Sequence, residues 1–204
     1  MTWVINTIAG IDEAGRGPLA GPVVAAVVVL DTGQVIAGVR DSKLLTPAQR
    51  SAAATRIRVE ARAWAIGEAT RAEIDELNIL QATFLAMQRA FAGLALLPAR
   101  VEVDGNRAPK LAGYGRELAT VVDGDQLRPA IAAASVLAKV HRDALMDELD
   151  ARYPGYGFQQ HRGYGTAAHR AALAALGPCP EHRRSFAPVQ ALLRAPAGPQ
   201  EGLA

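Results

Sequence analysis

The chain has 204 residues, of which 50% are hydrophobic and 21% are charged, and its formal net charge at pH 7 is +2. This length favours one domain with a sizeable core, and the composition excludes a wholly disordered chain. A single cysteine, Cys179, excludes an intrachain disulfide and a cysteine-based metal site. Its flanking prolines indicate a loop, which argues against a nucleophile. The N-terminus shows no basic stretch followed by a long apolar run.

The longest strongly apolar run, residues 23–30, is too short to cross a bilayer. We therefore expect a cytoplasmic protein without a membrane partner. Positive charge is concentrated in residues 151–200, which hold six arginines, five aromatic residues and one acidic residue, Glu181. Such a segment suits a polyanion whose bases can stack on rings. A solvated arginine-rich surface over core aromatics explains this segment equally well.

The first half of the chain predicts three strands and a helix. Residues 3–12 and 23–30 are apolar and β-branched, and the glycines and prolines between them indicate a hairpin-like pair of strands. Thr46 and Pro47 are typical of an N-cap and a first helical residue, and predict a helix over about 47–55. The alternation in residues 58–66 predicts a third strand.

The middle of the chain alternates between helices and strands. Apolar residues at steps of three and four predict a helix over 71–94, and short strands are expected at 100–104 and 118–123. Pro129 opens a long helix over about 130–151, whose alanines allow a close approach to a sheet. This order predicts an α/β domain on a mixed sheet.

The C-terminal part is turn-rich between Tyr153 and Gly165, and helices are expected at 166–176 and 187–194. We expect one catalytic domain over residues 1–194, which includes a C-terminal helical segment from about residue 150. Residues 195–204, with two prolines and two glycines, predict a frayed tail.

The stretch from Gly15 to Ala20 reads GRGPLA and fits G-x-G-x-x-A, the fingerprint of a dinucleotide-binding turn. That fingerprint requires a helix directly after the glycines, because the helix N-terminus holds the pyrophosphate. Here Gly21 and Pro22 follow at once, and a run of valines typical of a strand comes next. The context therefore argues against a redox cofactor.

Asp12 and Glu13, at the end of the first predicted strand, favour another chemistry. Neighbouring side chains on a regular strand point to opposite faces, so the two acids can share a site only where the strand ends or bulges. The glycines from Gly15 onward permit such a departure and allow a ligand to approach the backbone closely.

Further acids end the later strands, at Asp104, Asp123 and Asp125. Gathered carboxylates repel one another unless cations lie among them, and Mg²⁺ or Mn²⁺ prefers such oxygen ligands. Two ions there could support phosphodiester hydrolysis. Each Asp-Gly pair taken singly is also explained as a solvated turn.

Seven stretches occur in the order of one protein family and span most of residues 10–189. They are GIDEAGRGPLAGPVV (10–24), DSKLL (41–45), EIDELNIL (73–80), VDGN (103–106), AAASVLAKVHRD (132–143), YPGYGFQQHRGYGT (153–166) and HRRSFAPV (182–189). Together they show that the chain closely resembles bacterial type 2 ribonuclease H, or ribonuclease HII. The resemblance implies an RNase H-like fold, with a mixed five-stranded sheet flanked by helices and a C-terminal helical extension.

The resemblance also implies an endonuclease that cuts the RNA strand of RNA/DNA hybrids and incises 5′ to single ribonucleotides in duplex DNA, leaving 3′-hydroxyl and 5′-phosphate ends. The family's catalytic and metal-binding acids fall on Asp12, Glu13, Asp104 and Asp125, with two Mn²⁺ or Mg²⁺ ions as cofactors. Asp125 keeps the family spacing to the AAAS stretch, whereas Asp123 does not. The segment from residue 106 to Asp123 is slightly longer than the family's.

The same resemblance implies how the substrate is recognised. The family's Gly-Arg-Gly element falls on Gly15, Arg16 and Gly17, which would bind the ribonucleotide and its 2′-hydroxyl. Its junction-sensing tyrosine falls on Tyr164, and Lys43 is a candidate phosphate contact, although a solvated lysine explains that position equally well.

Several further residues and alternatives remain. His161 and His169 are expected to make phosphate or packing contacts, and Asp143, on the long helix, is expected to pair with an arginine. The expected partners are RNA/DNA hybrids and ribonucleotide-containing DNA, with a replication clamp as a candidate for recruitment, and the protein is expected to be monomeric. The alternative function is a non-catalytic nucleic-acid-binding protein that uses only the basic aromatic segment.

Overall fold

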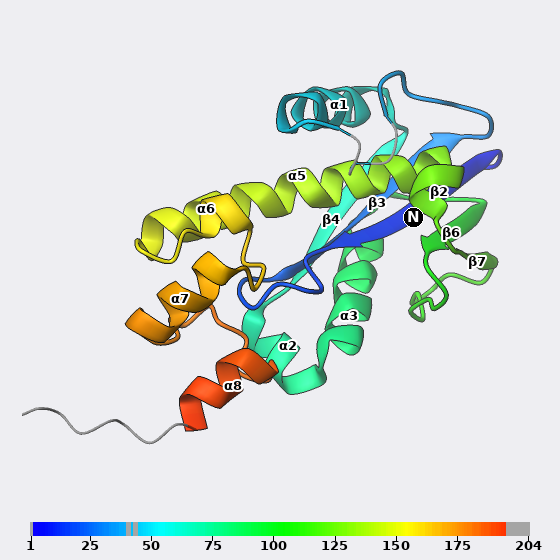
Figure 1. Cartoon of the computed structure of the whole chain (residues 1–204). Coiled ribbons are helices and arrows are strands. Elements are labelled where there is room, and N and C mark those ends of the chain that lie inside the picture. The colour runs from blue at the N-terminus through cyan, green and yellow to red at the C-terminus, as the bar shows by residue number, and fades with distance from the viewer. Residues whose placement is uncertain (1, 40–41, 43–44, 195–204) are drawn as a thin grey trace, which may run out of the picture.

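A five-stranded mixed sheet forms the centre of the computed structural model, which describes residues 2–39, 42 and 45–194 (Figure 1). Its strand order is β4-β3-β2-β6-β7, and only the β2–β6 and β6–β7 pairs are parallel. The strands are β2 (Thr7–Ala14), β3 (Val23–Asp31), β4 (Ala63–Ala69), β6 (Arg100–Asp104) and β7 (Glu117–Val121). β1 (Thr2–Trp3) and β5 (Leu96–Leu97) form a separate short parallel pair. The predicted mixed five-stranded sheet is confirmed.

Helices cover both faces of this sheet, and the C-terminal helices gather at one end (Figure 1). α3 packs against β3 and β4 on one face, while α5, itself contacted by α1, packs against β2 and β3 on the other. The helices are α1 (Pro47–Glu60), α2 (Arg71–Leu77), α3 (Ile79–Ala92), α4 (Gly124–Leu127), α5 (Pro129–Arg152), α6 (Phe158–His161), α7 (Ala167–Leu176) and α8 (Ala187–Arg194).

β3 explains why the sheet needs cover on both faces. Its alternate residues Val23, Ala25, Val27 and Val29 pack into the core beneath α3, and the intervening residues pack into the core beneath α5 and α1. A strand buried on both faces has a continuous apolar sequence, as residues 23–30 do. The antiparallel pairing of β2 with β3 confirms the predicted hairpin-like pair.

α5 lies very close to β2. A Cβ atom built on Gly10 would lie 2.1 Å from the backbone carbonyl carbon of Ala130, so no larger residue fits there. The alanines at 130 and 132–134 are buried and present little bulk to the sheet. The close approach predicted from these alanines is confirmed, and it places α5 directly beside the strand that carries Asp12.

The first helix is longer than the sequence suggested. α1 continues to Glu60, so residues 58–60 are helical and β4 begins only at Ala63. The apparent alternation in residues 58–66 was misleading because residues 58–60 belong to the helix, where the Val59 side chain is 79% exposed. Arg56 pairs with Glu60 one helical turn away, which favours the longer helix.

The predicted helix over residues 71–94 is two helices, divided at Asn78. This residue has a φ of 71°, which interrupts the helical backbone, and its side chain accepts hydrogen bonds from the N–H groups of Leu80 and Gln81. Asparagine tolerates such a backbone and caps helices well. The apolar spacing continued across the break, so periodicity alone did not reveal it. The tail predicted for residues 195–204 lies outside the described residues.

Candidate active site

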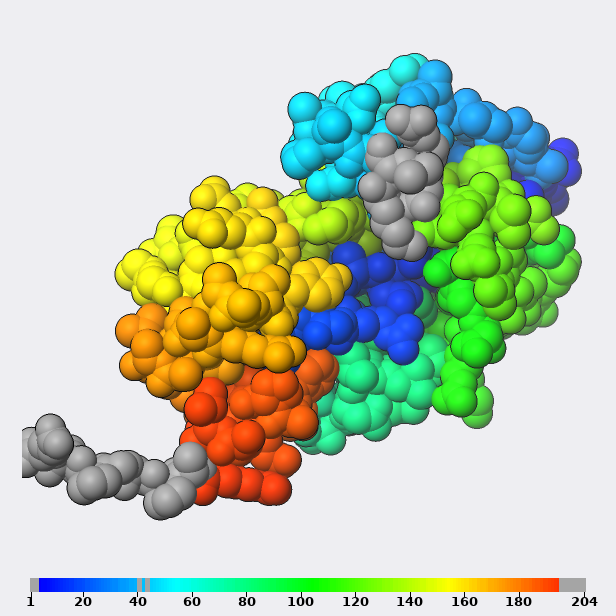
Figure 2. Space-filling model, viewed as in Figure 1, coloured from blue at the N-terminus to red at the C-terminus, as the bar shows by residue number. Residues whose placement is uncertain are grey.

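Four of the predicted acids line one hollow of about 340 Å³ at the end of β2. They are Asp12, Glu13, Asp104 and Asp125. The parallel pairing of β2 with β6 ends at Ile11 and Val103, so Asp12 and Asp104 are the next residues on two neighbouring parallel strands. In Figure 2 the blue N-terminal segment is visible between the yellow-to-orange C-terminal segments and the green segments.

Asp12 and Glu13 occupy an unfavourable electrostatic environment. Burial, reinforced by repulsion from Glu13 and Asp104, raises the pKa of Asp12 well above its usual value. Burial also raises the pKa of Glu13, although Arg16, 3.2 Å away, acts in the opposite direction. An Asp12 oxygen accepts a hydrogen bond from the Glu13 N–H at 2.7 Å. Glu13 lies within β2, one residue before its end, where the β6 pairing has already stopped.

A backbone hydrogen bond brings the third and fourth acids together. The N–H of Gly124 donates to Oδ1 of Asp104 at 2.7 Å, which ties the start of α4 to the end of β6. Asp125 on this short helix is 5% exposed and lines the hollow. Asp123 instead stands at the N-cap position of α4 with a φ of 55°, makes no side-chain capping hydrogen bond and is exposed. Placement thus favours Asp125 over Asp123, although Asp125 lies on a helix rather than at a strand end.

The hollow also contains polar residues that the sequence reasoning missed. Ser135 on α5 lies beside Asp12 and acts to lower the pKa of that carboxyl, against the effect of burial, and its hydroxyl lies 2.9 Å from that of Ser42. Arg50, Lys139 and Arg142 line the same space. Ser135 stands in the AAAS stretch, but its role depends on the close approach of α5 to β2, which the residue pattern alone does not reveal.

The predicted substrate contacts lie around the rim. Gly15, Arg16, Gly17 and Tyr164 all line the hollow, and a Cβ on Gly17 would lie 3.5 Å from the Tyr164 ring. Tyr164 is 48% exposed, as a residue that stacks on a substrate must be. Lys43 lies outside the described residues.

The donor chemistry of the hollow suits divalent cations. Carboxylate oxygens are the ligands that Mg²⁺ and Mn²⁺ prefer, and cations would relieve the repulsion that raises the Asp12 pKa. Among the described residues no group of three or more acidic, histidine or cysteine side chains is arranged so that it could hold a metal ion by itself. An open site of this kind leaves ligand positions to water and substrate, which is how Mg²⁺ is commonly bound.

His161, His169 and His182 pack against one another. His169 Nδ1 lies 2.9 Å from the Tyr164 carbonyl oxygen, and its Nε2 lies 3.0 Å from Nε2 of His182. Burial lowers the pKa of both, that of His182 to about 4, so both are neutral at pH 7. His161 stacks on His169 with ring centroids 4.3 Å apart. Of the two contacts expected for His161 and His169, the structure shows packing.

Asp143 makes the expected contacts with arginine. Its carboxylate lies 3.8 Å from Arg50 and 3.7 Å from Arg162, and it also pairs with Lys139. Asp143, which lies on α5, is thus paired with three basic side chains. It is well explained as a structural group that positions these side chains beside the hollow.

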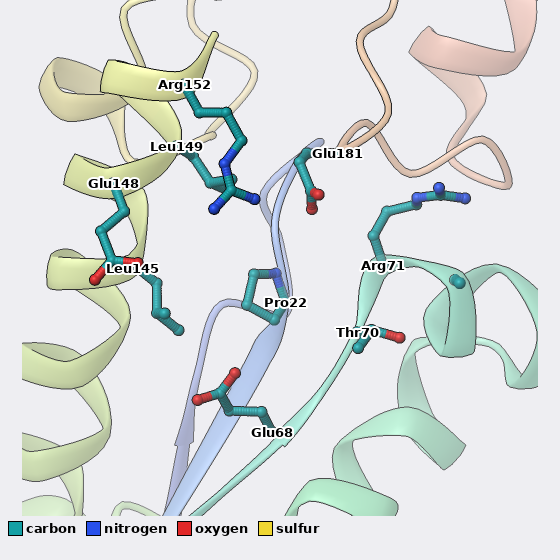
Figure 3. Close-up of a pocket in the computed structure, with 10 residues that line it drawn as sticks. Pro22, Glu68, Thr70, Arg71, Leu145, Glu148, Leu149, Arg152 and Glu181 are labelled. Carbon is teal, nitrogen blue, oxygen red and sulfur yellow. The ribbon is translucent and has the colours of Figure 1, made fainter.

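A second hollow of about 350 Å³ lies between β4, α5 and the start of α2 (Figure 3). Glu68, Glu148 and Glu181 face it together with Arg71 and Arg152, and Arg152 and Glu181 extend into it from opposite sides. Three glutamates would repel a phosphate backbone. The hollow at the end of β2, which combines strand-end acids with a rim of basic and glycine residues, is therefore the better candidate.

No described helix is long and apolar enough to cross a membrane.

Comparisons with known proteins identify the family of this chain. The family model described as Ribonuclease HII matches residues 9–189. A ribonuclease HII of Bordetella pertussis is 58% identical over 184 residues, which are 90% of each chain. One of Thiobacillus denitrificans is 60% identical over 186 residues, or 91% of this chain and 90% of the other.

Solved structures show the same fold. The ribonuclease H2 of Pyrococcus horikoshii OT3 superposes with a TM-score of 0.76 at 28% identity, covering 91% of this chain and 96% of that one. The RNase HII in a PCNA complex from Archaeoglobus fulgidus gives a TM-score of 0.68 at 27% identity, covering 87% and 92%. The resemblance seen in the sequence, and the RNase H-like fold that it implied, are thus confirmed. The chain belongs to the ribonuclease HII family and is a metal-dependent endoribonuclease of the ribonuclease H type.

Proposed function

We propose that this enzyme hydrolyses the RNA strand of RNA/DNA hybrids and also incises duplex DNA 5′ to single ribonucleotides, leaving 3′-hydroxyl and 5′-phosphate ends. The observation that carries this proposal is the shared hollow, where four carboxylates meet a glycine turn and an exposed tyrosine. The acids suit phosphodiester hydrolysis, and the turn suits recognition of a 2′-hydroxyl, the group that separates RNA from DNA.

Asp12, Glu13, Asp104 and Asp125 are proposed to hold two divalent ions, Mn²⁺ or Mg²⁺. Such ions, when bound, activate the attacking water and stabilise the leaving oxygen. Ser135, which lines the same hollow as Asp12, is proposed to orient that carboxylate, and the Gly124 N–H orients Asp104. Arg50 and Lys139 on the same hollow supply positive charge for a phosphate.

Recognition of the substrate is proposed to divide between two segments. Gly15, Arg16 and Gly17 bind the ribonucleotide, and Tyr164 stacks on the next sugar, where it detects the missing 2′-hydroxyl. Lys43 is proposed to contact a phosphate. The exposed side chain of Tyr164 beside Gly17 supports this division, because one sugar and its neighbour would lie against adjoining parts of the rim.

We further propose that residues 1–194 act as one catalytic domain. The Leu19 N–H donates to the Gly163 carbonyl at 2.8 Å and the Arg183 N–H to the Leu19 carbonyl at 2.8 Å, which ties the C-terminal segment to the glycine turn. The enzyme is proposed to be a cytoplasmic monomer. The Archaeoglobus fulgidus RNase HII was solved in complex with PCNA, which supports recruitment of this enzyme by a replication clamp.

Mapping the cleavage site on a duplex with one ribonucleotide tests the proposal. With Mg²⁺ or Mn²⁺ we expect a single cut 5′ to the ribonucleotide, and no cut with EDTA because the ionised acids need cations. An all-DNA duplex of the same sequence should stay intact. A cut 3′ to the ribonucleotide would contradict the proposal, and binding without cleavage in either metal would favour the non-catalytic alternative.

Replacing Tyr164 tests the junction role. Tyr164→Ala should lower kcat/KM on a single-ribonucleotide duplex about tenfold more than on an all-RNA hybrid, the scale of one lost stacking contact. Tyr164→Phe, which keeps the ring, should retain most activity on both substrates. Equal losses of Tyr164→Ala on the two substrates would reject the role.

A further inference from the structure

Arg183 is a fully buried arginine whose side-chain hydrogen bonds all go to the turn over residues 15–22. It is 0% exposed, and among the described residues it forms no ion pair. Its Nη2 donates to the Gly15 carbonyl at 2.6 Å and its Nη1 to the Arg16 carbonyl at 2.9 Å. Two further bonds reach the carbonyls of Gly21, at 3.0 Å, and Pro22, at 3.2 Å. Burying a guanidinium without a carboxylate is costly, so this arrangement calls for an explanation beyond packing.

The geometry of the peptide bond supplies one. In a trans peptide the carbonyl and the N–H point in opposite directions. The Gly15 carbonyl belongs to the same peptide as the Arg16 N–H, and the Arg16 carbonyl to the same peptide as the Gly17 N–H. Because Arg183 holds both carbonyls toward the interior, both N–H groups point away from it. Within the described part of the chain neither N–H donates a hydrogen bond, and both residues line the hollow.

We propose that Arg183 is a positioning residue that orients the Arg16 and Gly17 amides toward the substrate, so that they can donate to the 2′-oxygen of the ribonucleotide. This inference rests on the proposed function, and it assigns the discrimination between ribose and deoxyribose to a residue 166 positions or more along the chain. The planar guanidinium has five donors in a fixed fork, which two successive carbonyls require. A lysine ammonium carries the same charge without that fork.

A second buried arginine stabilises the adjoining backbone without holding these two peptides. Arg142 donates to the carbonyls of Ala20, Pro22 and Arg162. A Cβ on Gly15 would lie 2.0 Å from the Arg142 Nε, so Gly15 also allows the side chain to pass beneath the turn. The two arginines thus have different roles. Arg142 connects the turn to the segment before Tyr164, and Arg183 sets the direction of the Arg16 and Gly17 amides.

Arg183→Lys tests the proposal through substrate discrimination. We expect kcat/KM on a single-ribonucleotide duplex to fall about tenfold, the scale of one or two lost hydrogen bonds. The inhibition constant of the matched all-DNA duplex, which offers no 2′-hydroxyl, should stay within about twofold because phosphate contacts remain. A general loss of structure would weaken both. Ile57→Ala, which removes a buried side chain of α1 distant from the turn in sequence and contacts, is the destabilised control and should keep the discrimination.

The possible outcomes are distinguishable. Two results would overturn the proposal in an experiment where wild type cuts the ribonucleotide duplex. In the first, Arg183→Lys discriminates between the ribonucleotide duplex and the all-DNA duplex as well as wild type does. In the second, its binding of the all-DNA duplex weakens as much as its kcat/KM on the ribonucleotide duplex falls. If wild type does not cut that duplex, the proposed function itself fails. Should Arg183→Lys not fold, the amide ¹H shifts of Arg16 and Gly17 in wild type decide: a downfield shift with the ribonucleotide duplex alone supports the proposal, and equal shifts with both duplexes contradict it.

Discussion

Asp12→Asn should produce an inactive enzyme that is more stable than wild type when no metal is present. The buried Asp12 carboxylate lies beside Glu13 and Asp104, and its pKa is raised by burial and by their repulsion. Its protonated form therefore stabilises the fold at low pH, and this contribution is lost as pH rises through the raised pKa. At neutral pH this buried carboxyl beside two other acids costs stability, and a neutral amide of similar shape removes that cost.

The expected loss of activity is large. Removing a carboxylate that holds a catalytic cation forfeits several kcal/mol of transition-state stabilisation, so cleavage should fall on the order of 10³-fold or more. Binding of the duplex should remain largely intact because the basic and aromatic groups are unchanged. Asp104→Asn should likewise abolish incision.

Thermal unfolding in EDTA measures the stability gain. The Tm of Asp12→Asn should exceed that of wild type by about a few degrees near pH 7, and the difference should shrink toward pH 4, where wild-type Asp12 is protonated. Added Mg²⁺ or Mn²⁺ should raise the Tm of wild type more than that of the variant. Asp123→Asn, at an exposed acid, is the control and should change neither property. Unchanged cleavage by Asp12→Asn would remove this residue from the site.

Gly10→Ala, which adds a single methyl group, should cause a large loss in the free energy of unfolding. The new Cβ would lie 2.1 Å from the Ala130 carbonyl carbon and 2.2 Å from the Ile131 N, both backbone atoms of α5. Backbone cannot rotate away as a side chain can, so α5 must move off β2. Overpacking of this kind costs about 1–3 kcal/mol and more where backbone must shift, and we expect the upper end or failure to fold.

Activity should fall with it, because α5 carries Ser135 and Lys139 beside the acids. Gly115→Ala is the matched control: it adds the same methyl group where nothing lies within 4 Å, at an ordinary φ. Its free energy of unfolding, measured with denaturant, should stay within about 0.5 kcal/mol of wild type. A Gly10→Ala protein as stable as this control would show that α5 does not pack on β2 as closely as the structure places it.

Much of the fold could be predicted because patterns within single elements indicate those elements. The buried strand at residues 23–30, the Pro129 helix start and the alanines of α5 each reflect a constraint that acts within one element. The errors arose where the same residue pattern is compatible with two different structures. Residues 58–60 alternate as a strand would, and the apolar spacing of residues 71–94 continues through Asn78, whose positive φ is a property of the folded backbone.

The site divides in the same way. Asp12, Glu13 and Asp104 could be predicted because strand-end acids follow from the chain order. Asp125 required the family spacing, and the structure adds the Gly124 hydrogen bond that brings it beside Asp104. Lys43 could be named from the sequence but lies outside the described residues.

The sequence by itself determined the family, the kind of fold and the acids that line the candidate site, since contiguous motifs carry each of them. Only the tertiary structure decided how those motifs cooperate. Ser135 reaches Asp12 because Gly10 lets α5 approach, and Arg183 orients the turn from 168 residues beyond Gly15. The physical reason is that hydrogen bonds and burial depend on distance in space, and positions so far apart in the chain are brought together only by the packing of the whole core.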